Sequence, residues 1–118
     1  MAAAALPRNG SRNKRPDWAE LAESSPETPM GVLLRRFWQP VAASSDVEAG
    51  KATQIHLFNE YFTLYRGEGG EPHLVAQRCA HRCTELRVGW VEGDCIRCFY
   101  HGWKYDGTGQ CVEQPAEE

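Results

Sequence analysis

The sequence lacks any long apolar run. A membrane-spanning helix needs about 20 consecutive apolar residues, and none of the apolar stretches in the printed sequence approaches that length. The segment Met1–Leu6 is rich in alanine, but it is too short and too weakly apolar to form the core of a secretion signal. We therefore expect a cytoplasmic protein that does not contact a membrane.

An excess of positive charge is also lacking. The chain has 13 Lys and Arg residues against 16 Asp and Glu residues, which gives a net charge of -3. Proteins that bind nucleic acid usually carry a basic face that neutralises phosphates. Only residues 8–15 are locally basic, and their Gly, Asn and Ser neighbours indicate a disordered tail. We expect no nucleic-acid partner.

Cysteines are few and odd in number. A chain of 118 residues with five cysteines supports one small domain. Small secreted domains held by disulfides normally use an even number of cysteines. A disulfide framework is therefore not expected, and the cysteines need another interpretation.

Two short motifs give that interpretation. Cys79-Ala80-His81 and Cys98-Phe99-Tyr100-His101 each combine one thiol with one imidazole. Two cysteines and two histidines suit an unequal diiron cluster, in which thiolates hold one iron and imidazoles the other. A structural zinc ion takes the same four ligands, usually as a cysteine pair followed by a histidine pair. Zinc therefore stays an alternative.

The other cysteines and histidines receive simpler interpretations. Cys83, Cys95 and Cys111 are expected to be small packing residues in the interior. His56 and His73 lie in or beside predicted strands with polar neighbours. We expect both of these histidines to face solvent.

Two helices are expected before the β part of the chain. Residues 1–27 are interpreted as a flexible arm with a short helix over 17–23. Thr28 offers an N-cap and Pro29 a first helical residue for the second helix. The apolar stripe of this second helix is predicted to be core, and it consists of Met30, Leu33, Leu34 and Phe37.

The remainder of the chain has the pattern of short strands. Strands are predicted over residues 53–58, 61–65, 73–77, around 96, and over 103–105 and 111–112. Hairpin turns are expected at Asn59-Glu60 and Asp106-Gly107. The predicted fold is mainly β: a small antiparallel barrel or sandwich over residues 28–118, with a leading helix and two metal-bearing loops at one end.

Longer segments around these motifs show a family resemblance. The second motif continues as Gly102-Trp103-Lys104-Tyr105-Asp106, and Arg82 follows the first. The upstream segments are Thr28-Pro29-Met30-Gly31 and Leu34-Arg35-Arg36-Phe37-Trp38-Gln39-Pro40-Val41. Together they resemble the Rieske [2Fe-2S] domain at the N-terminal end of ring-hydroxylating oxygenase alpha subunits of the phthalate dioxygenase group. The resemblance covers about residues 26–118.

The resemblance implies a set of site residues. It implies a Rieske-type [2Fe-2S] cluster with the ligands Cys79, His81, Cys98 and His101. His101 would be the electron exit. Beside the cluster it places Arg82, Gly102, Trp103 and Tyr105.

The sequence departs from related patterns at three positions. Cys83 stands where the oxygenase family usually has glycine, which puts the local loop conformation in doubt. Tyr100 and Trp103 stand where high-potential respiratory Rieske proteins have a loop cysteine and a serine. A reduction potential at the negative end of the Rieske range is therefore expected.

The resemblance also implies partners. Oxygenases of this family carry a larger C-terminal domain whose mononuclear ferrous ion activates dioxygen, and we expect this domain to be absent from the chain. The chain alone would then take electrons from a flavin and iron-sulfur reductase without substrate turnover. A full-length form would be a homotrimer or a multiple of one, and the short form a monomer. A free-standing Rieske ferredoxin and a structural zinc-binding module stay as alternatives.

Overall fold

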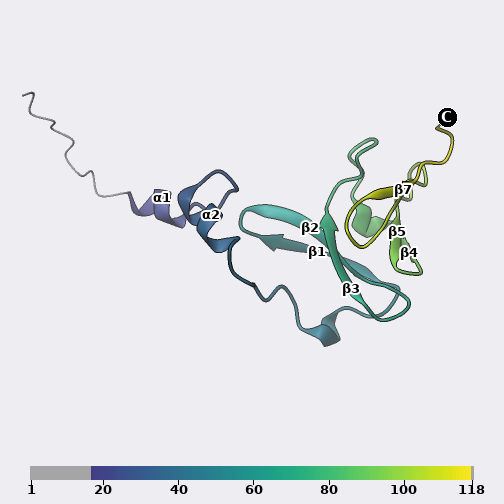
Figure 1. Ribbon diagram of the computed structural model, residues 1–118, viewed down its shortest axis with the longest axis horizontal. Coiled ribbons are helices and arrows are strands. Elements are labelled where there is room, and N and C mark those ends of the chain that lie inside the picture. The colour runs from purple at the N-terminus through teal and green to yellow at the C-terminus, as the bar shows by residue number, and fades with distance from the viewer. Residues whose placement is uncertain (1–16, 118) are drawn as a thin grey trace, which may run out of the picture.

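The computed structural model describes residues 17–117 (Figure 1). Most of the expected arm over residues 1–27 therefore lies outside the described residues. The two predicted helices are present as α1 (Trp18–Ala22) and α2 (Pro29–Leu34). Neither of them, nor any other helix in the described part, has the length and apolar character needed to cross a bilayer.

Helix α2 begins as predicted, but its apolar stripe is not core. Thr28 caps it by accepting a hydrogen bond from the Gly31 N–H at 3.1 Å. The stripe residues Leu33 and Phe37 are 49% and 63% exposed. The one buried residue is Gly31, where a Cβ would lie 1.9 Å from the Ser25 carbonyl oxygen. The prediction was wrong because α2 makes its close contact with the α1–α2 turn rather than with a sheet.

The first sheet is antiparallel and has the order β1-β2-β3. Its strands are β1 (Ala52–Leu57), β2 (Glu60–Arg66) and β3 (Pro72–Ala76). Leu57 pairs with Glu60, so the hairpin turn consists of Phe58 and Asn59, one residue earlier than predicted. Both turn residues have positive φ, 51° and 61°, as the right-handed twist of a two-residue hairpin requires.

The second sheet has the order β4-β5-β6-β7 and is also antiparallel. Its strands are β4 (Trp90–Glu92), β5 (Cys95–Arg97), β6 (Lys104–Tyr105) and β7 (Cys111–Glu113). Strand β4, which follows the 3-10 turn η2 (Leu86–Val88), was not predicted. The hairpin at Asp106 was predicted, and the Asp106 carboxylate accepts backbone N–H bonds from Thr108 and Gln110. The mainly β fold is therefore confirmed.

One apolar core joins the two sheets. Tyr65, Leu86 and Ile96 are at most 1% exposed and belong to a single cluster. The Tyr65 hydroxyl donates to the Asp94 carbonyl at 2.8 Å, and burial raises the pKa of this tyrosine to about 12. The side chain of His73 is only 21% exposed. The expectation that His73 faces solvent was wrong, because the β6–β7 turn covers it.

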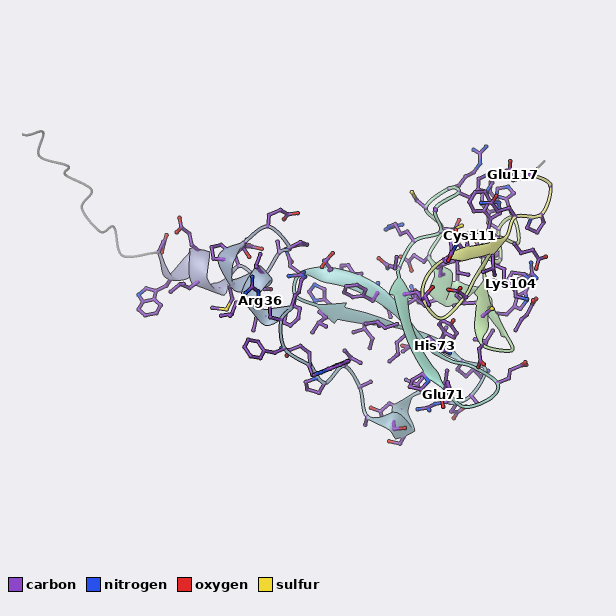
Figure 2. The ribbon with its side chains drawn as sticks, in the orientation of Figure 1. Arg36, Glu71, His73, Lys104, Cys111 and Glu117 are labelled. Atoms are coloured by element: carbon purple, nitrogen blue, oxygen red, sulfur yellow. The ribbon has the colours of Figure 1, made fainter. Side chains whose placement is uncertain are left out.

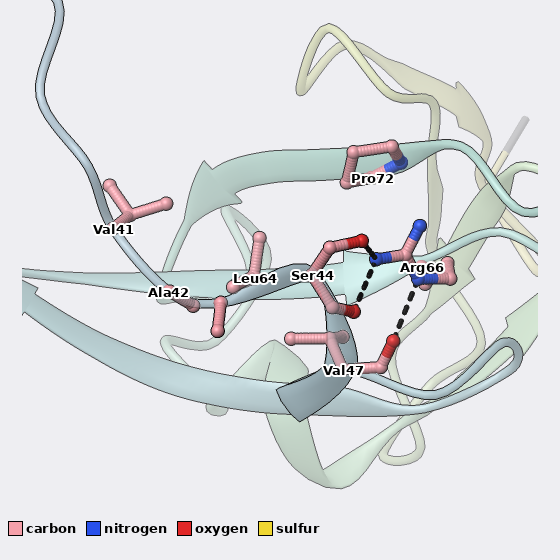
Figure 3. A pocket seen from close by; sticks show the side chains of 8 residues that line it. Val41, Ala42, Ser44, Val47, Leu64, Arg66 and Pro72 are labelled. Atoms are coloured by element: carbon pink, nitrogen blue, oxygen red, sulfur yellow. Dashed lines mark hydrogen bonds between the residues drawn. The ribbon is translucent and has the colours of Figure 1, made fainter.

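Arg66 attaches the segment before β1 to the first sheet. This segment contains the 3-10 turn η1 (Ser44–Asp46). The Arg66 guanidinium donates to the carbonyl oxygens of Val47 and Ser44, at 2.7 and 2.8 Å (Figure 3). A small pocket lined mainly by apolar side chains, among them Val41 and Leu64, lies beside these bonds (Figure 3). The guanidinium thus adds side-chain bonds to the backbone bridge between Ala49 and Arg66.

The first motif lies on a backbone loop, residues 79–84, that closes on itself. The Cys79 N–H donates to the Thr84 carbonyl at 2.8 Å, and the Cys83 N–H donates back to the Cys79 carbonyl at 2.9 Å. Cys83 has φ 56° and is exposed. The expectation that Cys83 is a buried packing residue was wrong, because the loop turns outward there.

The second motif lies on a matching loop, residues 98–103. The Cys98 N–H donates to the Trp103 carbonyl at 2.8 Å, and the Gly102 N–H donates to the Cys98 carbonyl at 3.0 Å. Gly102 has φ 78° and occupies the position that Cys83 occupies in the first loop. Both loops therefore need a left-handed residue four positions after the cysteine, and only the second has glycine there.

Replacing Cys83 with glycine is expected to stabilise the protein. A left-handed residue with a Cβ costs about 1–2 kcal/mol, whereas glycine adds about 0.5–1 kcal/mol of unfolded-state entropy. Cys83→Gly should therefore raise the free energy of unfolding by about 0.5–1 kcal/mol, measured by denaturant titration. Cys83→Ala is the control, because it removes the thiol and keeps the Cβ. A glycine variant no more stable than the alanine variant would contradict the strain at this position.

Candidate metal centre

Two buried thiols form the inner part of the candidate site. Cys79 and Cys98 are each 2% exposed. Cys98 directly follows β5, and Cys79 follows β3 after two residues. Both belong to the same buried cluster, Cys79 is close enough to raise the pKa of Cys98, and no disulfide joins them. Each loop therefore brings its cysteine to the same point in the interior.

Two imidazoles form the outer part of the site. The ring centroids of His81 and His101 are 4.6 Å apart, and the rings meet edge to face at 68°. Trp103 stacks on His81 with a centroid distance of 4.7 Å and an interplanar angle of 8°. His101 is exposed, while the His81 side chain is 22% exposed. The imidazoles thus lie nearer to solvent than the thiols.

Folding sorts the four side chains by chemical type. Each motif contains one cysteine and one histidine, yet in space cysteine meets cysteine and histidine meets histidine. Within residues 17–117, no three His, Cys, Asp or Glu side chains are gathered around a point that could hold one ion. The thiols thus form one pair and the imidazoles another, and this arrangement suits two metals with unequal ligands.

Two opposing effects act on the pKa of the Cys98 thiol. Burial raises the pKa of the Cys98 thiol, and the neighbouring Cys79 raises it further. Backbone N–H groups of Tyr100 and His101 donate to its sulfur and lower the pKa. The loop thus supplies donors for a thiolate where the interior disfavours one, as expected of a metal ligand.

Tyr105 reaches the other sulfur. Its hydroxyl lies 3.1 Å from Cys79 Sγ and accepts a hydrogen bond from the Ala80 N–H at 2.9 Å. Because the oxygen accepts from Ala80, its own hydrogen is free to donate to the sulfur. Burial, reinforced by Cys79, raises the pKa of Tyr105 above its ordinary range. The tyrosine therefore stays a neutral donor.

The remaining predicted site residues lie around these pairs. Arg82 is exposed beside His81. The indole Nε1 of Trp103 is buried without a hydrogen-bond partner among the described residues. Cys95 and Cys111, which were expected in the interior, are only partly buried.

Sequence reasoning missed two charged residues near the site. Glu117 places a carboxylate oxygen 3.8 Å from His81 Nε2, at the end of the chain labelled in Figure 2. Arg97 donates to the carbonyl of Gly102 in the second loop. Neither residue belongs to a recognisable motif. Only Arg97's place directly before Cys98 could have drawn attention to it.

The chain is similar to known proteins over most of its length. The sequence profile of the Rieske [2Fe-2S] domain matches residues 37–118. The chain is 41% identical over 99 residues to the 5,5'-dehydrodivanillate O-demethylase oxygenase subunit of a Sphingobium species. It is 43% identical over 98 residues to the phenoxybenzoate dioxygenase subunit alpha of Ectopseudomonas oleovorans. These matches cover 84% and 83% of this chain but only 23% and 24% of the relatives.

A solved structure shows the same likeness. The crystal structure of dicamba monooxygenase with non-haem iron and dicamba superposes with a TM-score of 0.64 at 28% identity. The match covers 69% of this chain and 24% of that one. The chain thus spans about a quarter of the length of its relatives. The chain is similar to a portion of oxygenase subunits, and the family profile matches most of its length. This chain therefore belongs to the Rieske [2Fe-2S] domain family.

Proposed function

We propose that Cys79 and Cys98 hold one iron of a [2Fe-2S] cluster and that His81 and His101 hold the other. The observation that carries this proposal is the pairing of like side chains from two mixed motifs, thiols inside and imidazoles outside. When bound, such a cluster supplies a carrier for single electrons. A structural zinc ion is disfavoured by the same pairing.

The ligands have different roles in electron transfer. The two thiols are shielded from solvent, so they keep the more negative half of the site away from a partner. His101 is exposed at the tip of the second loop, which supports it as the electron exit. Imidazole N–H groups that point outward can donate to a partner carboxylate.

The proposed physiological role is electron entry into an oxygenase that hydroxylates or O-demethylates aromatic compounds. The relatives are oxygenase subunits about four times as long as the matched segment. The related dicamba monooxygenase structure contains non-haem iron. A mononuclear iron domain of that kind would be the acceptor, and a flavin and iron-sulfur reductase the donor. We further propose a full-length form that is a homotrimer or a multiple of one, and a cytoplasmic location, where five free cysteines stay reduced.

Loss of one imidazole ligand is expected to abolish the cluster. His101→Ala should leave a protein without the visible absorption and the electron paramagnetic resonance signal that the dithionite-reduced wild type gives. Iron content per chain should fall in parallel. His56→Ala is the matched control, because His56 is exposed on β1 and stacks only on Tyr61. A wild-type spectrum in the His101 variant, or a colourless wild type that contains zinc, would contradict the proposal.

Tyr105 is expected to raise the reduction potential, because a donor to Cys79 Sγ stabilises the added negative charge of the reduced state. Tyr105→Phe should therefore shift the potential to a more negative value in a redox titration. Tyr65→Phe is the control: it also removes a buried hydroxyl, but one that bonds the Asp94 carbonyl.

The wild-type potential should itself lie in the negative part of the Rieske range of roughly −150 to +300 mV. A value well above zero would contradict this expectation.

Equal shifts of the reduction potential in Tyr105→Phe and Tyr65→Phe would show that the contact of Tyr105 with Cys79 Sγ has no specific effect.

The isolated chain is expected to accept electrons without converting a substrate. Mixed with NADH and an oxygenase reductase, it should be reduced, and its visible absorption should bleach. 5,5'-Dehydrodivanillate and phenoxybenzoate, the compounds after which two relatives are named, should remain unchanged in liquid chromatography when added with dioxygen. Conversion of either compound by the chain alone would overturn the assignment of catalysis to a separate domain.

A further inference from the structure

Arg97 lies beside the second loop and is not one of the proposed ligands. It is the last residue of β5 and directly precedes Cys98. Its side chain is only 14% exposed. An arginine this well covered needs several acceptors, because a guanidinium cannot lose its charge.

Two carboxylates hold the guanidinium from either side. Glu92 of β4 accepts from Arg97 Nε at 2.8 Å and from Nη2 at 2.9 Å. Glu113 of β7 accepts from Nη2 at 2.9 Å and from Nη1 at 3.2 Å. Lys104 on β6 (Figure 2) lies 3.2 Å from Glu92 and 4.0 Å from Glu113, so two cations balance two anions. The pKa of Glu92, held at about 2 chiefly by Arg97, keeps this carboxylate charged.

A third acceptor connects this group to the second loop. Arg97 Nη1 donates to the Gly102 carbonyl at 2.6 Å. The N–H of the same glycine donates to the Cys98 carbonyl at 3.0 Å. Both polar groups of Gly102 are thereby fixed, and its φ of 78° is a conformation that favours glycine. His101 precedes Gly102 directly, so the backbone that carries the imidazole is fixed from its C-terminal side.

We propose that Arg97 is the positioning residue of the second loop. Through its bond to the Gly102 carbonyl, Arg97 holds the backbone of His101 at a set distance from the sheet. This inference rests on the proposed function, because it concerns a residue assigned there as a ligand. The two ion pairs fix where the guanidinium lies, and its remaining N–H reaches the loop. The planar fork of arginine suits this task, since it serves three acceptors in one geometry.

The spectroscopic signature of the bound cluster tests the proposal. Arg97→Met removes all the donors at similar length, and it should shift the g values of the reduced protein and its reduction potential. The half-life of the cluster should fall about tenfold, as the loss of the one charge-assisted hydrogen bond from Arg97 to the loop predicts. Arg97→Lys, which keeps the charge without the fork, should shift the g values in the same direction by a smaller amount. It serves the same purpose if the methionine variant does not fold.

Two control variants separate positioning from a general effect on stability. Arg87→Met removes an exposed ion pair with Glu85 in the same domain and should leave the g values unchanged. Glu113→Gln weakens one ion pair but keeps both bonds to Glu92 and the bond to Gly102, so its g values should shift much less than those of Arg97→Met. Spectra of the Arg97 variants identical to the wild type, or a Glu113→Gln spectrum shifted as far as Arg97→Met, would overturn the inference. Absence of the signal from the wild type would instead overturn the proposed function, and this inference with it.

Discussion

The burial of two cysteine thiols at one point is the constraint on which the site depends. Cys79 and Cys98 come from different loops, and both are shielded from solvent. The Cys98 thiol resists ionisation in this place, because burial and the neighbouring Cys79 raise its pKa. Metal cations reverse this preference. The interior therefore suits a centre that brings its own positive charge, and it suits isolated thiolates poorly.

The two sheets position the two loops of the site. Strand β5 leads into the second loop without a spacer, and β3 leads into the first after two residues. Each loop is closed by one hydrogen bond that its cysteine N–H donates and by another that its cysteine carbonyl accepts. Such closed loops hold their shape without long strands. This explains how strands as short as β6, with two residues, suffice around the site.

The surroundings of the two loops differ, although their backbones match. The first loop has a strained left-handed cysteine at position 83, and the second has a relaxed glycine at position 102. Tyr105 reaches the sulfur of the first loop, whereas Arg97 reaches a carbonyl of the second. The more exposed histidine thus lies on the loop with the more extensive charged support.

The sequence by itself determined the family and the mainly β fold and predicted the candidate ligands, because these depend on local motifs: paired cysteine and histidine, turn residues and strand alternation. It also indicated the capped start of α2 at Thr28. It could not show that the α2 stripe is exposed, that His73 is covered or that Cys83 turns outward. Those outcomes depend on which surfaces meet across the fold. The two motifs also predicted that thiol would pair with thiol and imidazole with imidazole. The contact of Arg97 with Gly102 was decided only by tertiary structure, because it joins a strand end to a loop carbonyl whose relative placement no local pattern specifies.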